Sequence, residues 1–538
     1  AVSATPAAVA LRGRTAHGGM VTCPEVTAGA QPFWVAMLAG LFPARTVLVV
    51  TEGLKAQEGF HADLATWIRT QDADAGSPPS LFYPPWDILP HENKLPHSDV
   101  ISERLQTLVE LADATGGAAG PGRRVIVVTS VTALLQRTFP VAELREKTRR
   151  LRRGDNINPL DLIEWLEEVG HEPEAQVTNK GELSWRGGIV DVWPLSSPWP
   201  VRLEFFGDEL ESLREFDPHT QLSRGQVEAV TLPPAGELSL LKKRGAGNAG
   251  QGTGADLRPL ASLLDYLPAD TLFVLCEPDA LLDHALRYRQ TVPPADAFFL
   301  PWDDLLADAE QRGLVRFDVT GLDAENVGGS GPVRGEDLDL VLPADPAMPP
   351  APSARPDGPL LTFTSLDAFR PIAATLPDPQ VAEAQRREFF AQLHRWGRQG
   401  HSVHVFCNND GERQRFGELW QEYGFGGTPV ATDLGTLSRG FIQPDAKLVV
   451  VTDAEIFGRY KVQRPRRLKS PHAQAMRSAF EVDFTDFEEG DHVVHLQHGI
   501  GIFRGLKTLA AAGARGTGRV EPGSGQECLV VEFAASAP

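Results

Sequence analysis

Residues 25–32 (EVTAGAQP) have the spacing of a phosphate-binding P-loop but none of its functional side chains. In a P-loop, GxxxxGK[ST], glycines let backbone N–H groups surround phosphate, the Lys pairs with the phosphates, and the hydroxyl binds magnesium. The defining positions hold Glu25, Ala30, Gln31 and Pro32. Glu25 repels phosphate, Gln31 carries no charge, and Pro32 has neither a hydroxyl nor an N–H. We therefore expect the scaffold of a nucleotide-binding α/β domain that binds no nucleotide. The alternative is an ordinary loop before a core helix, unrelated to a P-loop.

The segments that follow this loop predict an α/β fold. Residues 33–38 form an apolar helical pattern that leads to the β-branched run 47–50 (VLVV). The same character returns in four more short runs, at residues 125–128, 271–275, 403–406 and 448–451. Each run is continuous and is flanked by helical patterns, which is typical of buried parallel strands.

Composition indicates a multidomain protein of the cytoplasm. The 538 residues predict roughly three to five domains. The four cysteines have no CxxC spacing, which suits a reducing compartment and argues against a structural zinc site. No segment has the pattern of a membrane span or a signal peptide, and the lack of an initial Met suggests that Ala1 is not the native start. The net charge of −20 opposes wrapping of nucleic acid, so we expect protein partners.

Three stretches rich in Gly, Pro or Ala, at residues 112–122, 242–254 and 343–359, are predicted to be flexible loops or linkers. Residues 188–193 and 201–206 are predicted strands. The second of these alternates strictly, with Val201, Leu203 and Phe205 on one face and Arg202, Glu204 and Phe206 on the other.

The C-terminal region predicts further β structure. Residues 493–494, 502–503 and 529–533 are strand candidates, and a Gly-rich hairpin tip is expected at residues 510–526. We expect the start of a small β-barrel that is not closed by Pro538.

Four groups of residues, in this order along the chain, resemble one bacterial family. They are residues 81–90 (LFYPPWDILP) with 97–105 (HSDVISERL), residues 181–194 (GELSWRGGIVDVWP) with 202–209 (RLEFFGDE), residues 453–458 (DAEIFG), and residues 490–501 (GDHVVHLQHGIG). The family is the transcription-repair coupling factors, and the match covers its N-terminal half. The second group is similar to a domain shared with the excision-repair protein UvrB, and the fourth to the Tudor-like opening of CarD-type regulators.

The resemblance implies a multidomain α/β fold with five parts. Residues 1–140 would be UvrB-like domain 1a, with the degenerate, helicase-like P-loop, and residues 141–236 the inserted α+β domain 2, which binds UvrA. Residues 237–345 would be domain 1b, and residues 346–470 a linker followed by a small α/β domain 3. Residues 471–538 would hold a linker and an incomplete, Tudor-like RNA polymerase-interacting domain.

The same resemblance implies a non-catalytic adaptor that recruits UvrA to lesion-stalled RNA polymerase. In the full-length family, a C-terminal double-stranded-DNA translocase uses ATP and magnesium to displace the polymerase, and it makes most of the DNA contact. UvrB keeps its nucleotide loop and a Tyr-rich hairpin that grips damaged DNA, whereas no such insertion lies between Phe82 and Leu108 here. The alternatives are a UvrB-like or helicase NTPase with an unorthodox nucleotide site, and a CarD-type transcription regulator.

Arg202 and Phe206 are predicted to share one strand face, and an Arg beside an exposed aromatic ring is typical of a binding hot spot. By resemblance, Arg186, Arg202 and Phe206 match the family positions that contact UvrA. The alternative is that Arg202 pairs with Glu204 or Glu209 and that Phe206 packs at a sheet edge.

The family binds the β subunit of RNA polymerase by adding its own sheet edge to that of the partner. By resemblance, Leu509 matches an apolar contact position in this interaction. A hairpin core residue is the alternative.

Other constellations are given structural interpretations. His492, His495 and His498 have the spacing of metal ligands, but strand alternation scatters them over both faces, so no metal is expected. Residues 448–455 imitate a Walker B strand, but we expect a buried strand with a solvated C-terminal turn. The basic run 145–153 is expected to be a solvated face, and the run 461–469 to help bind upstream DNA.

Overall fold

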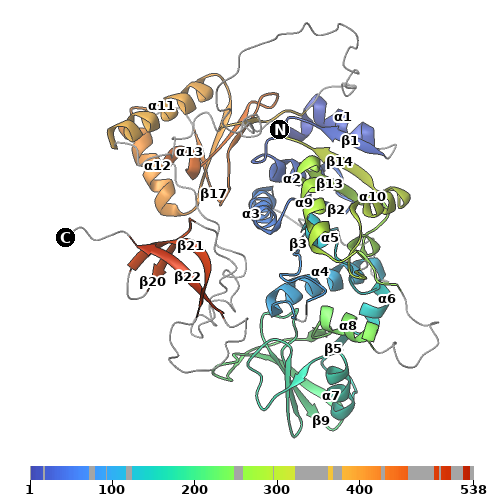
Figure 1. Cartoon of the computed structure of the whole chain (residues 1–538). Helices are drawn as coiled ribbons and strands as arrows, with labels where there is room; N and C mark the ends of the chain where they lie inside the picture. The colour runs from blue at the N-terminus through green and yellow to red at the C-terminus, as the bar shows by residue number, and fades with distance from the viewer. Residues whose placement is uncertain are drawn as a thin grey trace. The chain divides into compact units, whose positions relative to one another are not determined.

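The computed structural model describes the chain in thirteen stretches. They are residues 2–15, 19–71, 79–92, 94–116, 124–246, 259–294, 296–321, 361–366, 379–425, 430–457, 490–495, 499–510 and 525–533. The chain divides into two compact units, Ala1–Arg467 and Leu468–Pro538 (Figure 1). The finer division into five domains stays a prediction, and the predicted linker 343–359 and the basic run 461–469 lie outside the described residues.

A six-stranded, entirely parallel sheet forms the centre of the first unit. In spatial order its strands are β1 (Met20–Cys23), β14 (Val315–Val319), β13 (Leu272–Cys276), β2 (Val47–Thr51), β4 (Ile126–Ser130) and β3 (Ser80–Tyr83). Three of the predicted runs are therefore confirmed as strands β2, β4 and β13. Within β2, Val47 and Val49 pack into one core and Leu48 and Val50 into another, because helices cover both faces.

Helices surround this sheet, and together they make what we call the parallel-sheet module (Figure 1). They are η1 (Val2–Ala4), α1 (Pro6–Arg14), α2 (Gln31–Leu41), α3 (Leu54–Gln71), α4 (Ser98–Gly116), α5 (Val131–Leu134), α6 (Val141–Glu146), α8 (Leu238–Ala246), η3 (Leu263–Tyr266), α9 (Pro278–Thr291) and α10 (Trp302–Gln311).

Two predicted loops begin later than the sequence suggested. Helix α4 continues to Gly116, and α8 extends to Ala246. Ala112 and Leu241 are buried in the same hydrophobic core, and this packing prolongs segments whose Ala and Leu residues favour helix. The rest of both predicted loops, residues 117–123 and 247–254, lies outside the described residues.

An insert module lies between α6 and α8 in the sequence. Its six-stranded sheet has the order β11 (Ser223–Gln226), β10 (Glu209–Phe216), β9 (Val201–Phe206), β8 (Ile189–Val192), β7 (Glu182–Arg186) and β6 (Glu172–Pro173), and a second sheet pairs β5 (Arg149–Arg152) with β12 (Ala229–Leu232). Helix α7 (Pro159–Glu168) packs Leu162 and Leu166 against Val190 and Leu203 of the larger sheet. We call the face opposite α7 the outer face.

A middle module completes the described part of the first unit. Its mixed sheet has the order β15 (Thr364–Ser365), β18 (Phe441–Gln443), β19 (Leu448–Thr452), β16 (Ser402–Cys407) and β17 (Ala431–Leu434), with helices α11 (Pro379–Arg398), α12 (Asp410–Glu422) and α13 (Asp453–Phe457). The runs 403–406 and 448–451 are confirmed as strands β16 and β19, which pair with each other in parallel.

The second unit contains a three-stranded antiparallel sheet of β20 (His492–His495), β21 (Gly499–Ala510) and β22 (Gly525–Phe533). His492 and His495 lie in β20, and His498 lies outside the described residues. In the part of the chain that the structure describes, no helix combines the length and the apolar character needed to cross a bilayer.

Candidate functional site

The loop with P-loop spacing joins β1 to α2 at the carboxyl end of the parallel sheet. Helix α2 begins at Gln31, after Ala30, and Pro32 lies in its first turn, where a missing N–H costs no hydrogen bond. Glu25 has a positive φ of 62°. The N–H groups of Ala30 and Gln31 both donate to the Thr27 carbonyl, at 2.8 and 3.2 Å. These donors therefore close a turn inside the loop, where a P-loop would direct them toward phosphate.

The side chain of Gln31, at the position of the P-loop lysine, is 4% exposed. Its Nε2 donates to Glu277 Oε1 at 2.6 Å and to the Val26 carbonyl at 3.3 Å. Glu277, which follows β13, also accepts a hydrogen bond from the N–H of Gly321, which follows β14, at 2.8 Å. The amide of Gln31 and the carboxylate of Glu277 thus join the ends of three parallel strands.

The middle module covers this loop. The N–H of Phe363 donates to the Glu25 carbonyl at 2.7 Å. A Cβ placed on Gly29 would lie 2.7 Å from the Cβ of Arg439, so a side chain there would displace Arg439. The loop is consequently closed by its own hydrogen bonds and by a neighbouring part of the chain.

Aromatic packing holds the middle module in this position. The ring centroid of Phe33, in α2, lies 4.9 Å from that of Trp67, 5.2 Å from that of Phe441 and 6.1 Å from that of Phe363. Trp67, in α3, also lies 5.1 Å from Phe406. The Phe33–Phe441 pair is tilted and the other three are edge-to-face. Aromatic pairs at these distances stabilise an interface beyond simple burial of apolar area.

The three residues predicted to contact UvrA all lie on the outer face of the insert module. Arg186 pairs across the strands with Ile189, and Ile189 pairs with Glu204 of β9. Arg202 and Phe206 flank Glu204 on the same face, since residues two apart point the same way. Phe206 is 79% exposed and Ile189 is 37% exposed. The face therefore presents apolar side chains and guanidinium groups together.

Arg202 is paired with a residue that the sequence reasoning did not name. Its Nε and Nη2 donate to Oδ1 and Oδ2 of Asp191, each at 2.8 Å, from the directly opposed position on β8. The ion pair of Arg202 is therefore with Asp191 and not, as the alternative had it, with Glu204 or Glu209; Glu204 forms its ion pair with Arg214, at 3.3 Å. The exposure of Phe206 also contradicts its alternative as an edge-packing residue.

Leu509 lies in β21, where its backbone is opposite Gln526 of β22. The position therefore belongs to a hairpin strand of the second unit, and its role in partner binding stays a prediction.

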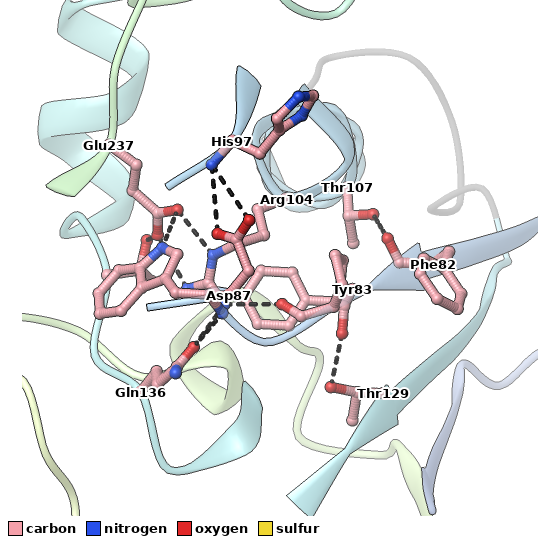
Figure 2. Close-up of polar contacts among 12 residues, drawn as sticks. Phe82, Tyr83, Asp87, His97, Arg104, Thr107, Thr129, Gln136 and Glu237 are labelled. Atoms are coloured by element: carbon pink, nitrogen blue, oxygen red, sulfur yellow. Dashed lines mark hydrogen bonds and ion pairs between the residues drawn. The ribbon is translucent and has the colours of Figure 1, made fainter. Parts of the chain in front are cut away.

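A buried charged network connects the two segments of the first family-like group, residues 81–90 and 97–105, and Figure 2 shows it. Arg104 of α4 donates from Nε and Nη2 to Glu237, at 2.7 and 2.9 Å, and both side chains are fully buried. Nη2 also donates to Tyr83 Oη, and Nη1 donates to Gln136 Oε1 and to the Pro84 carbonyl. Burial is the largest single influence and lowers the pKa of Arg104, but the attraction of Glu237, its hydrogen bonds and the neighbouring tyrosines together raise the pKa, so the guanidinium stays charged.

Glu237 immediately precedes α8, where the chain leaves the insert module. Its carboxylate also accepts hydrogen bonds from Trp86 Nε1 at 3.0 Å and Thr138 Oγ1 at 2.8 Å. The network thus anchors the return of the chain to the parallel-sheet module. Tyr83 and Trp86 were part of the sequence signature, but no local pattern identified Arg104 and Glu237 as partners.

The residues that imitate a Walker B strand need one correction. Strand β19 is buried, as predicted, but its C-terminal turn is not solvated, because Glu455 is only 1% exposed. Its carboxylate accepts hydrogen bonds from the N–H groups of Gly440 and Thr452, at 3.1 and 2.8 Å. This carboxylate closes a turn within the middle module.

Two family models match parts of the chain. The UvrB interaction domain matches residues 150–238, which correspond to the insert module. The CarD-like/TRCF RID domain matches residues 487–537, which contain β20, β21 and β22.

Curated relatives match most of the chain. It is 25% identical to the transcription-repair-coupling factor of Escherichia coli (strain K12), over 80% of this chain and 38% of that protein. It is 29% identical to the factor of Mycobacterium bovis, over 95% of this chain and 42% of that protein. It is 24% identical to the factor of Bacillus subtilis, over 87% of this chain and 40% of that protein. The chain spans between 38% and 42% of the length of these relatives. It is therefore a homologue of the transcription-repair-coupling factors and corresponds to their N-terminal region, with a UvrB interaction domain and an RNA polymerase-interacting domain.

Proposed function

We propose that this chain is a non-catalytic adaptor of the bacterial cytoplasm that recruits UvrA to stalled RNA polymerase. The observation that carries the proposal is the outer face of the insert module, where Arg186, Arg202 and the 79%-exposed Phe206 lie together. Aromatic and Arg side chains of this kind dominate the free energy of protein–protein binding. The match of this module to the UvrB interaction domain favours UvrA as the partner.

Direct binding of the chain to UvrA tests this proposal. We expect Arg202→Ala and Phe206→Ala each to weaken binding about thirtyfold, or about 2 kcal/mol. Leu222→Ala is the matched control, because Leu222 is also exposed, at 69%, but precedes the edge strand β11. Absence of binding by the unmodified chain, or equal losses in the control, would contradict the proposal.

A second docking surface lies in the second unit. We assign it to the β subunit of RNA polymerase, through Leu509 and the edge of a Tudor-like sheet. The unpaired edge of an antiparallel sheet offers N–H and C=O groups to a partner strand. Leu509→Ala should weaken binding to the isolated β subunit and leave UvrA binding unchanged. Loss of both interactions together would indicate general unfolding.

We propose that this chain binds no nucleotide. The N–H groups of the degenerate loop are turned inward, Gln31 is engaged with Glu277, and Arg439 lies against Gly29. ATP, magnesium, translocation on double-stranded DNA and most of the DNA contact are assigned to parts of the longer relatives that this chain does not span. Magnesium-ATP should therefore leave the midpoint of thermal unfolding unchanged, whereas a bound nucleotide at saturation would raise it.

A further inference from the structure

The guanidinium of Arg202 is held in one orientation before any partner arrives. Asp191 accepts two parallel hydrogen bonds from it, and the ring of Phe216 lies beneath it, with its centroid 4.8 Å from Cζ. The Arg202 and Asp191 side chains are 22% and 15% exposed. Hydrogen bonding to Asp191 raises the pKa of Arg202, so the charge persists beside the ring. The side chain is therefore both ionised and fixed.

The hydrogen bonds to Asp191 use two of the three guanidinium nitrogens of Arg202. Nε and Nη2 face Asp191, and Nη2 also lies 3.4 Å from Gln221 Oε1. Nη1 makes no hydrogen bond to any residue that the structure describes. A planar guanidinium with a free donor edge is suited to a carboxylate, which accepts from it with defined geometry.

The surroundings of Nη1 combine charged and apolar side chains. On the outer face, Arg186, Arg202 and Arg214 lie among the carboxylates of Asp191, Glu204 and Glu209, so the preference for a carboxylate rests on the Nη1 donor and not on an excess of positive charge. Ile189, directly opposite Glu204, and Phe206, directly opposite Glu209, add apolar surface to this face. A partner with a carboxylate next to an apolar side chain would match both regions.

We propose that Asp191 is a positioning residue for this interface: it holds Arg202 ready for a carboxylate of the partner, which places an adjacent apolar side chain on Phe206 and Ile189. This inference rests on the proposed function, UvrA being the partner. The physical reason is preorganisation, because a side chain that is already ordered loses little conformational freedom on binding. Removing Asp191 should weaken binding about three- to tenfold.

Asp191 could affect binding in two other ways, and each has a different signature. A purely structural role would weaken binding regardless of what stands at position 202. Simple neutralisation of Arg202 would mean that loss of Asp191 strengthens the attraction for an acidic partner. Positioning requires the effect of Asp191 to depend on Arg202.

A double-mutant cycle measures that dependence. UvrA affinity is determined for the unmodified chain, Asp191→Ala, Arg202→Ala and the double variant. We expect Asp191→Ala to weaken binding about three- to tenfold when Arg202 is present and to change it less than about twofold when Arg202 is Ala. Equal losses in both backgrounds, or tighter binding by Asp191→Ala, would overturn the proposal.

Two further variants guard against trivial outcomes. Glu211→Ala removes the same charge from an exposed position of β10 and should leave the affinity for UvrA unchanged. A loss of affinity as large as that caused by Asp191→Ala would overturn the proposal. If Asp191→Ala fails to fold, Asp191→Asn serves instead, because it keeps the shape and one acceptor, and the same dependence on Arg202 is required of it. A chain that does not bind UvrA overturns the proposed function as well, whereas binding that ignores Arg202 and Asp191 overturns only the positioning role.

Discussion

Two Arg–carboxylate pairs in this chain share one geometry and differ in their surroundings. Arg104 and Glu237 meet in the parallel-sheet module with both side chains fully buried, and Arg202 and Asp191 meet on the outer face of the insert module with 22% and 15% exposure. Both guanidinium groups donate two hydrogen bonds to one carboxylate and lie over aromatic rings.

The difference lies in the remaining donors. All three nitrogens of the Arg104 guanidinium donate hydrogen bonds within the fold, since Nη2 also reaches Tyr83 and Nη1 reaches Gln136 and a backbone carbonyl. Nη1 of Arg202, by contrast, makes no hydrogen bond to a residue that the structure describes. An Arg–carboxylate pair thus anchors the fold where it is enclosed, and we propose that the more open pair prepares a binding surface.

The largest expected effect comes from breaking the enclosed pair. Arg104→Ala or Glu237→Ala leaves an uncompensated buried charge, which should lower the free energy of unfolding by about 3–5 kcal/mol. Denaturant-induced unfolding of the chain measures this change. A loss below about 1 kcal/mol for both variants would show that the network is not an anchor.

A second enclosed group, the imidazole of His171, sharpens the comparison because its burial is not offset by an ion pair with a described residue. Burial lowers the pKa of this imidazole from 6.5 to about 4, and the interaction with the Leu166 backbone opposes this shift only in part. Above pH 6.5 it is neutral in both states; as the pH falls from 6.5 to about 4, only the unfolded state gains the proton. The free energy of unfolding should therefore fall by up to about 3 kcal/mol over this window.

Unfolding measured at pH 7.5 and pH 4.5 checks this expectation. His171→Phe should reduce the acid-induced loss, and His219→Phe, which alters an exposed imidazole of the same module, is the control. Equal losses in the two variants would contradict the assignment to His171.

Opening the exposed pair should separate binding from stability. Arg202→Ala is expected to reduce UvrA affinity by about 2 kcal/mol but the free energy of unfolding by less than about 1 kcal/mol, since the Asp191 carboxylate that it leaves can be hydrated. Paired measurements of binding and unfolding on one preparation test this separation. A stability loss as large as that of Arg104→Ala would remove the distinction between the two pairs.

The smallest effect is expected from the more exposed neighbour. Arg214 and Glu204 are 40% and 31% exposed and lie 3.3 Å apart. Arg214→Ala should change the free energy of unfolding by about 0–1 kcal/mol, and salt should reduce the difference further. A larger change in the free energy of unfolding, or one that salt does not reduce, would indicate that the Arg214–Glu204 pair stabilises the fold as the enclosed Arg104–Glu237 pair does.

Several parts of the fold followed from local patterns. The runs at residues 47–50, 125–128 and 271–275 were identified as parallel strands because continuous apolar sequence implies that both faces are covered. The alternation of residues 201–206 placed Arg202 and Phe206 on one face, because side chains in a strand have a period of two. The same reasoning failed at Ala112 and Glu455, where packing with distant segments extended a helix and buried a carboxylate.

By itself, the sequence determined the strand runs, the loss of P-loop chemistry at Glu25, Ala30, Gln31 and Pro32, and the face shared by Arg202 and Phe206. Only the tertiary structure decided the partners: Glu237 for Arg104, Asp191 for Arg202, and Glu277 for Gln31. Periodicity and side-chain chemistry are local and can be seen along the chain. The choice between Asp191, Glu204 and Glu209 depends on strand register, and the meeting of residues 104 and 237 depends on how the chain returns from the insert module.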